Sequence, residues 1–405
     1  MIGRTISKRF LSLSDDFKIL LLTGSRQVGK TTLLKMLRED SRSYITLDNK
    51  ASLDLAKDDP EAFFILNPPP CMIDEVQRAP ELFLKIKELV DASDKKNQVW
   101  LTGSQKPRLM KHVSDTLAGR VCEIDMYPLS QAEKQGNPYR PSFYPEFDGK
   151  KPSLWGYMET IENVLLGGYP EMLSIKKENR SDWLASYIST YLLGDILDED
   201  DDLIDILDFR RLLHVLAART AQELNYSAIA SETGLSNYKV KKLVTLLESY
   251  GIIFLLPPYS GNTLKSIVKT PRMYFTDSGL CSALLGIEDP EGFLKHPLAG
   301  RIFESYVVSE LIRNARNNGD YANFYFYREE NKGKSTGPAE IDLIKEKGGI
   351  DYPIEIKLNA TPVKKMARWF DAIPEEKRGM GTIVCMGKEK TLLSKDILVL
   401  PVSMI

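Results

Sequence analysis

The fold of the first part of the chain is decided by the stretch Leu20-Leu-Leu-Thr-Gly24-Ser-Arg-Gln-Val-Gly29-Lys30-Thr31-Thr32-Leu-Leu. An apolar strand leads into a turn bracketed by two glycines, and Lys-Thr then opens an apolar-periodic helix. Glycine tolerates left-handed torsions, so the N–H groups of such a turn and the positive end of the helix dipole point at a bound anion. We therefore predict a nucleotide phosphate loop made of Gly24, Ser25, Arg26, Gln27, Val28, Gly29, Lys30, Thr31 and Thr32.

Two side chains of this loop are expected to contact the nucleotide directly. The Lys30 ammonium would reach the β- and γ-phosphates, and the Thr31 hydroxyl would bind Mg²⁺. A glycine-rich turn without a ligand is the alternative. The strand before the loop and the helix after it argue against that alternative.

Composition limits the class of protein. The chain has 405 residues, of which 43% are hydrophobic and 27% charged, so about two or three globular domains are expected. The net charge of −2 provides no global basic field, so any DNA contact must come from a local patch. Long apolar runs and a signal-peptide pattern are missing, which predicts a cytoplasmic protein without membrane contact. The 4 cysteines and 3 histidines are too scattered for a disulfide framework or a His-based metal site.

Apolar runs alternate with helical patterns, such as Glu81–Ala92, through residues 1–130. The predicted strands are Lys18–Thr23, Ser43–Leu47, Pro70–Ile73, Val99–Thr102 and Val121–Met126. This alternation predicts a mostly parallel sheet with helices on both faces. Ligands of such sheets bind at the carboxyl ends of the strands.

Polar residues follow two of these strands. Asp74 and Glu75 end the third strand, where Asp74 would hold Mg²⁺ and Glu75 would orient and deprotonate the attacking water. Thr102, Ser104 and Gln105 end the fourth strand and are candidates for sensing the γ-phosphate. Solvated acids at a strand end and an ordinary turn are the alternatives.

Several motifs together resemble the additional-strand, catalytic-Glu branch of P-loop ATPases, the AAA-like group. They are Gly24-Ser-Arg-Gln-Val-Gly-Lys-Thr-Thr, Ile73-Asp-Glu-Val-Gln77, Leu101-Thr-Gly-Ser104, Leu117-Ala-Gly-Arg120 and Tyr127-Pro-Leu-Ser130. More narrowly, the chain is similar over nearly its whole length to a bacterial and archaeal family that joins an AAA-type ATPase to a C-terminal region with a nuclease-like fold. The resemblance implies ATP binding and hydrolysis, with no defined cellular task. ATP and Mg²⁺ are thus the expected cofactors.

Two arginines are candidates for contacts with the nucleotide. Arg120 matches a family position and would neutralise transition-state charge, in cis or from a neighbouring subunit of a homo-oligomer. Arg26 lies inside the phosphate loop and would contact the nucleotide or pair with an acid. A surface ion pair is the alternative for each.

Residues 131–208 are predicted to form a helical linker region. Its parts are a polar loop over Gln135–Pro152, a turn between helices at Gly167–Glu171 without a chemical role, and a crowd of acids from Asp195 to Asp208. The acids lack the ligand order of a calcium loop, so we expect a solvated helix end or linker.

Residues 209–275 are predicted to form a winged-helix module. A short helix, a glycine-containing turn, a second helix with one buried stripe and a hairpin follow one another. The residues that would face a DNA major groove or lie near the wing are Asn237, Tyr238, Lys239, Lys241, Lys242, Lys265 and Lys269. Packing or protein contacts are the alternative role of this module.

Residues 276–405 resemble the α/β restriction-endonuclease fold. Glu304 falls on the apolar side of a predicted helix, where a carboxylate needs a partner or lines a site. Asp342 lies on one strand, and Glu355 and Lys357 share a face of the next. The resemblance implies Mg²⁺ held by Asp342 and Glu355, with Glu304 assisting and Lys357 polarising the phosphate or orienting the water. Exposed ion pairs are the alternative.

These features predict a Mg²⁺-dependent ATPase whose nucleotide state controls winged-helix and nuclease-like modules. Lys30, Glu75 and Arg120 would be its catalytic residues. Two other functions stay open: a metal-dependent DNA nuclease gated by ATP, and a switch that binds DNA or protein and holds nucleotide without turnover. The expected partners are nucleotide, DNA through the last two modules, and further copies of the chain.

Overall fold

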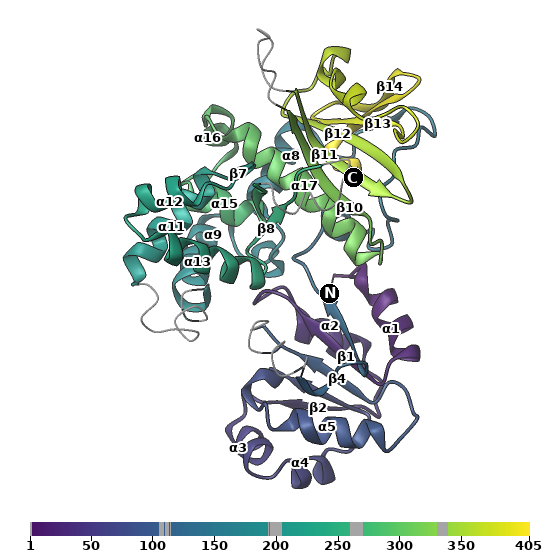
Figure 1. Ribbon diagram of the computed structural model, residues 1–405, viewed down its shortest axis with the longest axis vertical. Helices are drawn as coiled ribbons and strands as arrows, with labels where there is room; N and C mark the ends of the chain where they lie inside the picture. The colour runs from purple at the N-terminus through teal and green to yellow at the C-terminus, as the bar shows by residue number, and fades with distance from the viewer. Residues whose placement is uncertain are drawn as a thin grey trace.

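The computed structural model describes residues 2–104, 109, 113, 115–192, 194, 205–259, 270–329 and 339–405. Three sheets with their helices follow one another along the chain. In Figure 1 the N-terminal sheet lies at the bottom, the middle helices lie on the left and the C-terminal sheet lies at the upper right. Gln105, Lys265, Lys269 and the acids from Asp195 to Asp202, which the sequence analysis singled out, lie outside the described residues.

The N-terminal sheet is entirely parallel, as the alternating pattern predicts. Its strands are β1 (Ile19–Thr23), β2 (Ser43–Thr46), β3 (Cys71–Asp74), β4 (Val99–Thr102) and β5 (Val121–Asp125). They lie in the order β2-β3-β4-β1-β5, so β4 separates the strand before the phosphate loop from the strand that ends in Asp74. This is the additional strand that the resemblance implies.

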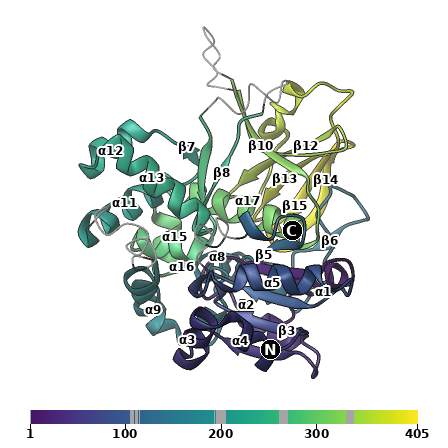
Figure 2. The same ribbon diagram turned by 60° about the horizontal axis from the view of Figure 1, so that its bottom comes forward.

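Helices cover both faces of this sheet, which comes forward in Figure 2. They are α1 (Ile6–Asp16), α2 (Lys30–Leu37), α3 (Lys50–Asp58), α4 (Pro60–Leu66), the 3₁₀ turn η1 (Val76–Arg78) and α5 (Leu82–Asp91). Along β1, Leu20 joins one hydrophobic core and Leu21 the other, because strand side chains alternate between faces. On the first face, the rings of Phe10 and Trp100 pack edge to face with centroids 4.9 Å apart.

The predicted linker region contains short helices and one strand. Its elements are α7 (Gln131–Lys134), β6 (Lys151–Pro152), α8 (Tyr157–Leu166), η2 (Pro170–Leu173), η3 (Lys177–Asn179), α9 (Arg180–Ser186) and η4 (Tyr187–Leu192). Gly167 and Gly168 form the predicted turn, and the Gly168 N–H donates to Asp277 Oδ2 at 2.6 Å. Strand β6 pairs with a strand near the end of the chain, so part of the predicted loop belongs to the C-terminal sheet.

In the middle part, the described residues form a sheet of three antiparallel strands and three helices. The elements are α11 (Ile206–Ala218), β7 (Gln222–Glu223), α12 (Tyr226–Thr233), α13 (Asn237–Ser249), β8 (Ile253–Leu256) and β9 (Arg272–Phe275). Gly234 ends α12 with a φ of 78°, and the Ser236 hydroxyl caps α13 by accepting from the Lys239 N–H at 3.2 Å. The turn and cap therefore lie where the sequence predicts them.

The C-terminal sheet is mixed, and helix α17 packs against it. The helices are α15 (Ser278–Leu284), α16 (Pro290–Lys295) and α17 (Ala299–Asn317), with 3₁₀ turns η5 (Lys364–Ala367), η6 (Phe370–Ala372) and η7 (Val402–Met404). The strands are β10 (Asn323–Glu329), β11 (Ala339–Lys347), β12 (Ile350–Lys357), β13 (Gly381–Cys385), β14 (Glu389–Ser394) and β15 (Ile397–Pro401), in the order β10-β11-β12-β13-β15-β14-β6. Among the described residues, no helix combines the length and the apolar character needed to cross a membrane.

Candidate functional site

The phosphate loop connects β1 to α2 and requires glycine at two positions. Gly24 has a φ of 139°, and a Cβ there would lie 2.2 Å from the carbonyl oxygen of Met126. Gly29 has a φ of 96° and is the N-cap of α2. Gln27 also has a left-handed φ, of 62°. The backbone therefore turns as a phosphate loop must, with the helix N-terminus at its end.

Lys30 is held within the curve of this loop. Its ammonium donates to the carbonyl oxygens of Gly24 and Ser25, both at 2.9 Å, and the residue is only 6% exposed. The positive charge thus lies against the loop that would wrap an anion. Phosphate oxygens of a bound nucleotide could replace these carbonyl partners.

Asp74 ends β3 beside the start of α2 and is surrounded by hydroxyl groups. The Thr31 hydroxyl donates to its Oδ1 at 2.9 Å, the Tyr44 hydroxyl donates to its Oδ2 at 3.1 Å, and the Thr102 hydroxyl donates to Oδ1 as well. Burial, together with the Asp74 carboxylate, raises the pKa of Tyr44 to about 12. An oxygen-only, anionic group of this kind fits a hydrated Mg²⁺ ion, with Thr31 and Asp74 as the residues to hold it.

Glu75 follows in a strained backbone conformation. Its φ of 58° is left-handed, and its N–H donates to the Thr102 hydroxyl at 3.2 Å. The carboxylate accepts from the Ser104 hydroxyl at 3.1 Å and from the Gln77 side-chain amide. Such strain is found at functional sites because the surrounding structure must hold it. Gln77 is part of a motif in the sequence analysis, but its contact with Glu75 was not predicted.

Arg4 is a second residue of the site that the sequence analysis missed. Its guanidinium donates to the carbonyl oxygens of Val28 at 2.8 Å and Tyr127 at 2.6 Å, and Nε lies 3.2 Å from a carboxylate oxygen of Glu133. It is 5% exposed. Arg4 therefore connects the back of the phosphate loop to α7. No local pattern signals this role, because all three partners are distant in sequence.

Arg120 lies at the wrong end of the sheet to act on a nucleotide in its own chain. It directly precedes β5, whose first residue, Val121, pairs with Ile19 at the start of β1. The phosphate loop follows the other end of β1. The guanidinium binds Asp91 in a two-bonded ion pair, with Nε 2.6 Å and Nη2 2.9 Å from the carboxylate oxygens. The expected role in cis is therefore wrong, and only the role across subunits stays a prediction.

Arg26 of the phosphate loop contacts a residue of the predicted linker region. Its guanidinium lies over the Tyr191 ring, 5.7 Å from the centroid. Tyr191 belongs to η4 at the end of the predicted linker region. The arginine thus links the phosphate loop to that region, and a contact with the nucleotide stays a prediction.

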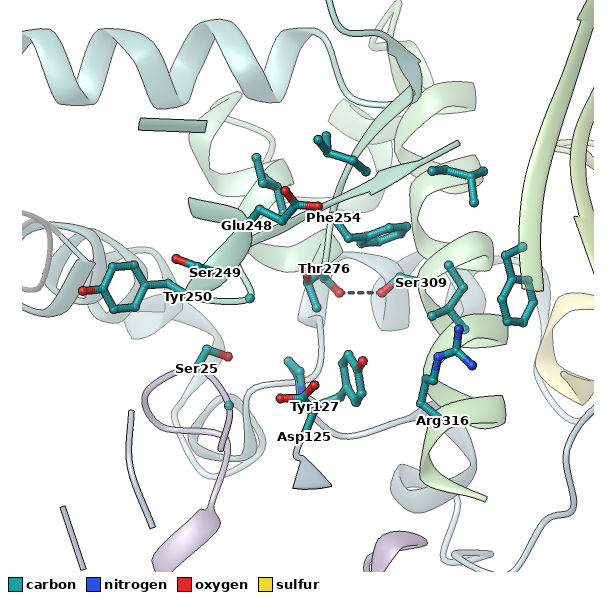
Figure 3. A pocket seen from close by; sticks show the side chains of 18 of the residues that line it. Ser25, Asp125, Tyr127, Glu248, Ser249, Tyr250, Phe254, Thr276, Ser309 and Arg316 are labelled. Carbon is teal, nitrogen blue, oxygen red and sulfur yellow. Dashed lines mark hydrogen bonds between the residues drawn. The ribbon is translucent and has the colours of Figure 1, made fainter. Parts of the chain in front are cut away.

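A cavity of about 730 Å³ opens beside the phosphate loop (Figure 3). Its walls come from all three parts of the chain: Ser25 and Tyr127 from the N-terminal part, Tyr250 from the middle part, and Ser309 and Arg316 from α17 of the C-terminal part.

The C-terminal acid cluster consists of Glu304, Glu340, Asp342 and Glu355. Leu343 pairs with Ile354 across β11 and β12, so Asp342 and Glu355 lie opposite each other. The Lys357 ammonium lies 2.6 Å from Glu355 Oε1 and 3.3 Å from Asp342 Oδ2. The structure therefore brings Asp342, Glu355 and Lys357 together, as the resemblance implies.

Arg272 of β9 enters the same cluster and was not predicted to do so. Its Nη1 lies 3.6 Å from Glu304 Oε1, and its Nη2 donates to Glu340. The Tyr274 hydroxyl donates to Glu304 Oε1 at 2.8 Å. Burial, and then the neighbouring Asp342 carboxylate, raise the pKa values of Glu304 and Glu355 to about 8.

The Mg²⁺ site expected at Asp342 and Glu355 does not fit this arrangement. The described residues contain no group of three or more His, Cys, Asp or Glu side chains placed to hold a metal ion. The Lys357 ammonium lies 3.3 Å from Asp342 Oδ2, and the Ile356 N–H donates to the same oxygen at 2.8 Å, so a metal ion at this oxygen would have to compete with both. Glu304 has found partners in Arg272 and Tyr274 instead of a metal.

Helix α13 presents part of the predicted DNA-binding face to solvent. Asn237, Tyr238 and Lys241 are exposed, with Tyr238 at 73%. Lys239 and Lys242 are half-buried. The described part of this face therefore carries few free cations.

Comparison with protein families divides the chain into three matched regions. Residues 16–134 match a family described as an AAA domain. Residues 159–291 match one domain of unknown function (DUF8612), and residues 299–405 match another (DUF4143). The first match identifies the N-terminal region as an AAA-type domain of the P-loop ATPase class.

Similar proteins are found in bacteria and archaea. An uncharacterized protein of Mycobacterium tuberculosis is 27% identical over 390 residues, which cover 96% of this chain and 80% of the relative. An uncharacterized protein of Methanocaldococcus jannaschii is 25% identical over 331 residues, covering 78% of this chain and 70% of the relative.

Among solved structures, RuvB of Thermotoga maritima has a TM-score of 0.30 at 19% identity, covering 63% of this chain and 90% of its own. A Signal Transduction ATPase with Numerous Domains from Pyrococcus horikoshii has a TM-score of 0.23 at 13% identity. The match covers 78% of this chain and 49% of that chain. Scores this low do not establish a shared overall fold.

Proposed function

We propose that this protein is a Mg²⁺-dependent ATPase. The observation that carries the proposal is the meeting of Lys30, Thr31, Asp74 and Glu75 at the carboxyl ends of β1 and β3, two parallel strands with β4 between them. A cation within the loop and two acids beside it are what phosphoryl transfer to water requires. The match of this region to an AAA domain supports the same function.

Each residue has a separate role in the proposed reaction. Lys30 neutralises charge on the β- and γ-phosphates. Mg²⁺ held by Thr31 and Asp74 would supply further neutralisation of that charge. Glu75 orients the attacking water and accepts its proton, while Ser104 and Gln77 hold the Glu75 carboxylate in position.

The proposal extends to the attached parts of the chain. We interpret α11 to α13 with β8 and β9 as a winged helix, and the C-terminal sheet with α17 as a nuclease-like fold. The shared cavity lies between the phosphate loop and both modules, and Arg4 joins the loop to α7. Nucleotide state would thereby control these two modules, whose partners, DNA or protein, bind through surfaces such as Tyr238 and Lys241.

The experiment compares ATP binding and hydrolysis by the wild-type chain, Lys30→Ala and Glu75→Gln. Lys30→Ala should lose ATP binding, whereas Glu75→Gln should keep it and lose turnover by about 10²-fold, the scale of a lost general base. Glu81→Gln is the matched control, since Glu81 is exposed at the start of α5, and it should behave as wild type.

Two results would change the proposal. If Glu75→Gln hydrolyses ATP at the wild-type rate, Glu75 does not act on the water. If the wild-type chain binds ATP and releases phosphate only at the background rate, the protein is a nucleotide-dependent switch and not an ATPase.

A further inference from the structure

Arg4 lies directly behind the phosphate loop and is almost completely buried. Its Nη1 donates to the Val28 carbonyl oxygen at 2.8 Å and lies 3.7 Å from the point where a Cβ of Gly29 would stand. Val28 is fully buried, as Arg4 is but for 5% of its surface. A buried carbonyl oxygen needs a hydrogen-bond donor, and Arg4 supplies one to the loop.

The geometry of the peptide bond passes this contact on to the Gly29 N–H. A trans peptide unit is planar, so the carbonyl of one residue and the N–H of the next point in opposite directions. Because the Val28 carbonyl points at Arg4, the Gly29 N–H points away from it. Gly29 is the N-cap of α2, and N–H groups at this end of a helix are those that bind phosphate. A guanidinium bonded to the carbonyl also polarises the peptide unit, which makes its N–H a stronger donor.

The other contacts of Arg4 hold its guanidinium in place. Nη2 donates to the Tyr127 carbonyl oxygen at 2.6 Å, and Nε lies 3.2 Å from Glu133 Oε2. Glu133 is 1% exposed and accepts from the Thr5 N–H at 2.7 Å and from the Ser130 N–H at 2.9 Å. If the guanidinium turned away, this buried carboxylate would lose its cation, which is costly. Arg4 is therefore a fixed support behind the loop.

We propose that Arg4 is a positioning residue of the nucleotide site, which orients the peptide unit between Val28 and Gly29 so that the Gly29 N–H can bind a phosphate. The inference rests on the proposed function, since it assumes that the loop binds the phosphates of a nucleotide. Arg4 itself does not touch these phosphates. It raises nucleotide affinity through the backbone of the loop.

A second buried arginine in the same sheet offers a matched control. Arg42 is 1% exposed, its Nη2 donates to the Asn97 carbonyl oxygen at 2.9 Å, and its Nε lies 2.9 Å from Glu39 Oε2. It lies at the opposite end of the sheet, where Nη1 donates at 3.4 Å to the carbonyl oxygen of Cys71, the first residue of β3. Arg4→Gln and Arg42→Gln thus remove an ion pair and hydrogen bonds to backbone carbonyls alike, but only Arg4 contacts the phosphate loop.

The experiment measures ATP binding to the full chain by calorimetry in the presence of Mg²⁺, with urea unfolding of each variant. Arg4→Gln should weaken ATP binding by about tenfold or more, the scale of one or two lost hydrogen bonds. Arg42→Gln should lose stability as well, yet bind ATP within about twofold of wild type, because its contacts are distant from the loop.

Steady-state kinetics separates positioning from a general loss of structure. The loop would contact phosphate in the ground state and in the transition state, so Arg4→Gln should raise KM and leave kcat within about threefold of wild type. A merely structural defect would instead lower kcat through the unfolded fraction and leave KM unchanged, and that result would contradict the proposal.

Arg4→Lys decides if Arg4→Gln does not fold. Lysine keeps a cation beside Glu133 but lacks the planar fork that reaches two carbonyl oxygens and a carboxylate at once, so this variant should fold and still bind ATP more weakly than wild type. Unchanged ATP affinity in a folded Arg4 variant would overturn the proposal, as would an equal loss of affinity in Arg42→Gln. If the wild-type chain itself binds no ATP, the proposed function fails first and this inference falls with it.

Discussion

The two groups of acids in this chain are neutralised in opposite ways. Beside the phosphate loop, Asp74 accepts hydrogen bonds from three hydroxyl groups, and no lysine or arginine in the described part of the chain forms an ion pair with it. In the C-terminal acid cluster, every carboxylate is paired with Arg272 or Lys357. In the described residues, the first group thus has hydroxyl partners at Asp74, whereas the second is paired with cations of the chain itself.

Similar residue patterns therefore have different consequences in the two groups. An acid held by hydroxyls can bind a hydrated metal ion that arrives with a nucleotide. An acid paired with a buried guanidinium, as Glu304 is with Arg272, already has a cation of the chain beside it. Acidic residues beside the phosphate loop can thus bind a metal ion, whereas those of the C-terminal acid cluster form ion pairs within the chain.

Removing Asp74 should affect ATP turnover far more than removing Asp342. Asp74→Asn should lower ATP turnover by about 10²-fold, because it removes a residue that would hold Mg²⁺ against the phosphates. Asp342→Asn should leave turnover within about twofold of wild type. Steady-state ATP hydrolysis at saturating Mg²⁺ measures the turnover of both variants. An equal loss of turnover in Asp74→Asn and Asp342→Asn would show that the two groups of acids do not differ in this way.

A smaller effect is expected from one of the hydroxyl partners. Thr102 is fully buried and contacts both phosphate-loop acids, donating to Asp74 and accepting from the Glu75 N–H. Thr102→Val keeps its shape but leaves the Glu75 N–H without this partner and removes one of the hydrogen bonds to Asp74, so the free energy of unfolding should fall by about 1 to 3 kcal/mol. Urea unfolding measures the change. Unaltered stability would mean that water replaces the hydroxyl without cost.

A further prediction concerns a pH dependence of stability that arises in the C-terminal acid cluster. The pKa of Glu304 is raised from its ordinary 4.5 to about 8, so the native state holds a proton that the unfolded chain has released between these values. The free energy of unfolding should therefore decrease as pH rises through this range. Glu304→Gln should reduce the slope of stability against pH, as followed by urea unfolding. An identical slope in the variant would show that Glu304 titrates normally.

The sequence predicts the parallel sheet and the residues of the phosphate loop because their signals are local. Glycine torsions, an apolar strand and the helix that follows all lie within about fifteen residues. Asp74 then falls at the same edge of the sheet, at the carboxyl end of another parallel strand. Glu304 on the apolar side of its helix correctly signals a buried carboxylate with a partner.

The contacts that connect the parts of the molecule could not be predicted in this way. Arg4 reaches Glu133 and Arg272 reaches Glu340, and neither pair has any sequence spacing that marks it. Likewise, β6 lies in a polar, proline-containing loop by composition and pairs only because β14 offers a free edge. Long-range pairing of charged side chains depends on the tertiary fold, which periodicity does not encode.

The most direct test of the contrast between the two groups of acids is Mn²⁺ uptake with and without a non-hydrolysable ATP analogue, followed by the electron paramagnetic resonance signal of free Mn²⁺. The wild-type chain should take up one Mn²⁺ ion only when the analogue is present, and Asp74→Asn should lose this uptake while Asp342→Asn retains it. Mn²⁺ uptake by the nucleotide-free chain that disappears in Asp342→Asn would contradict the account.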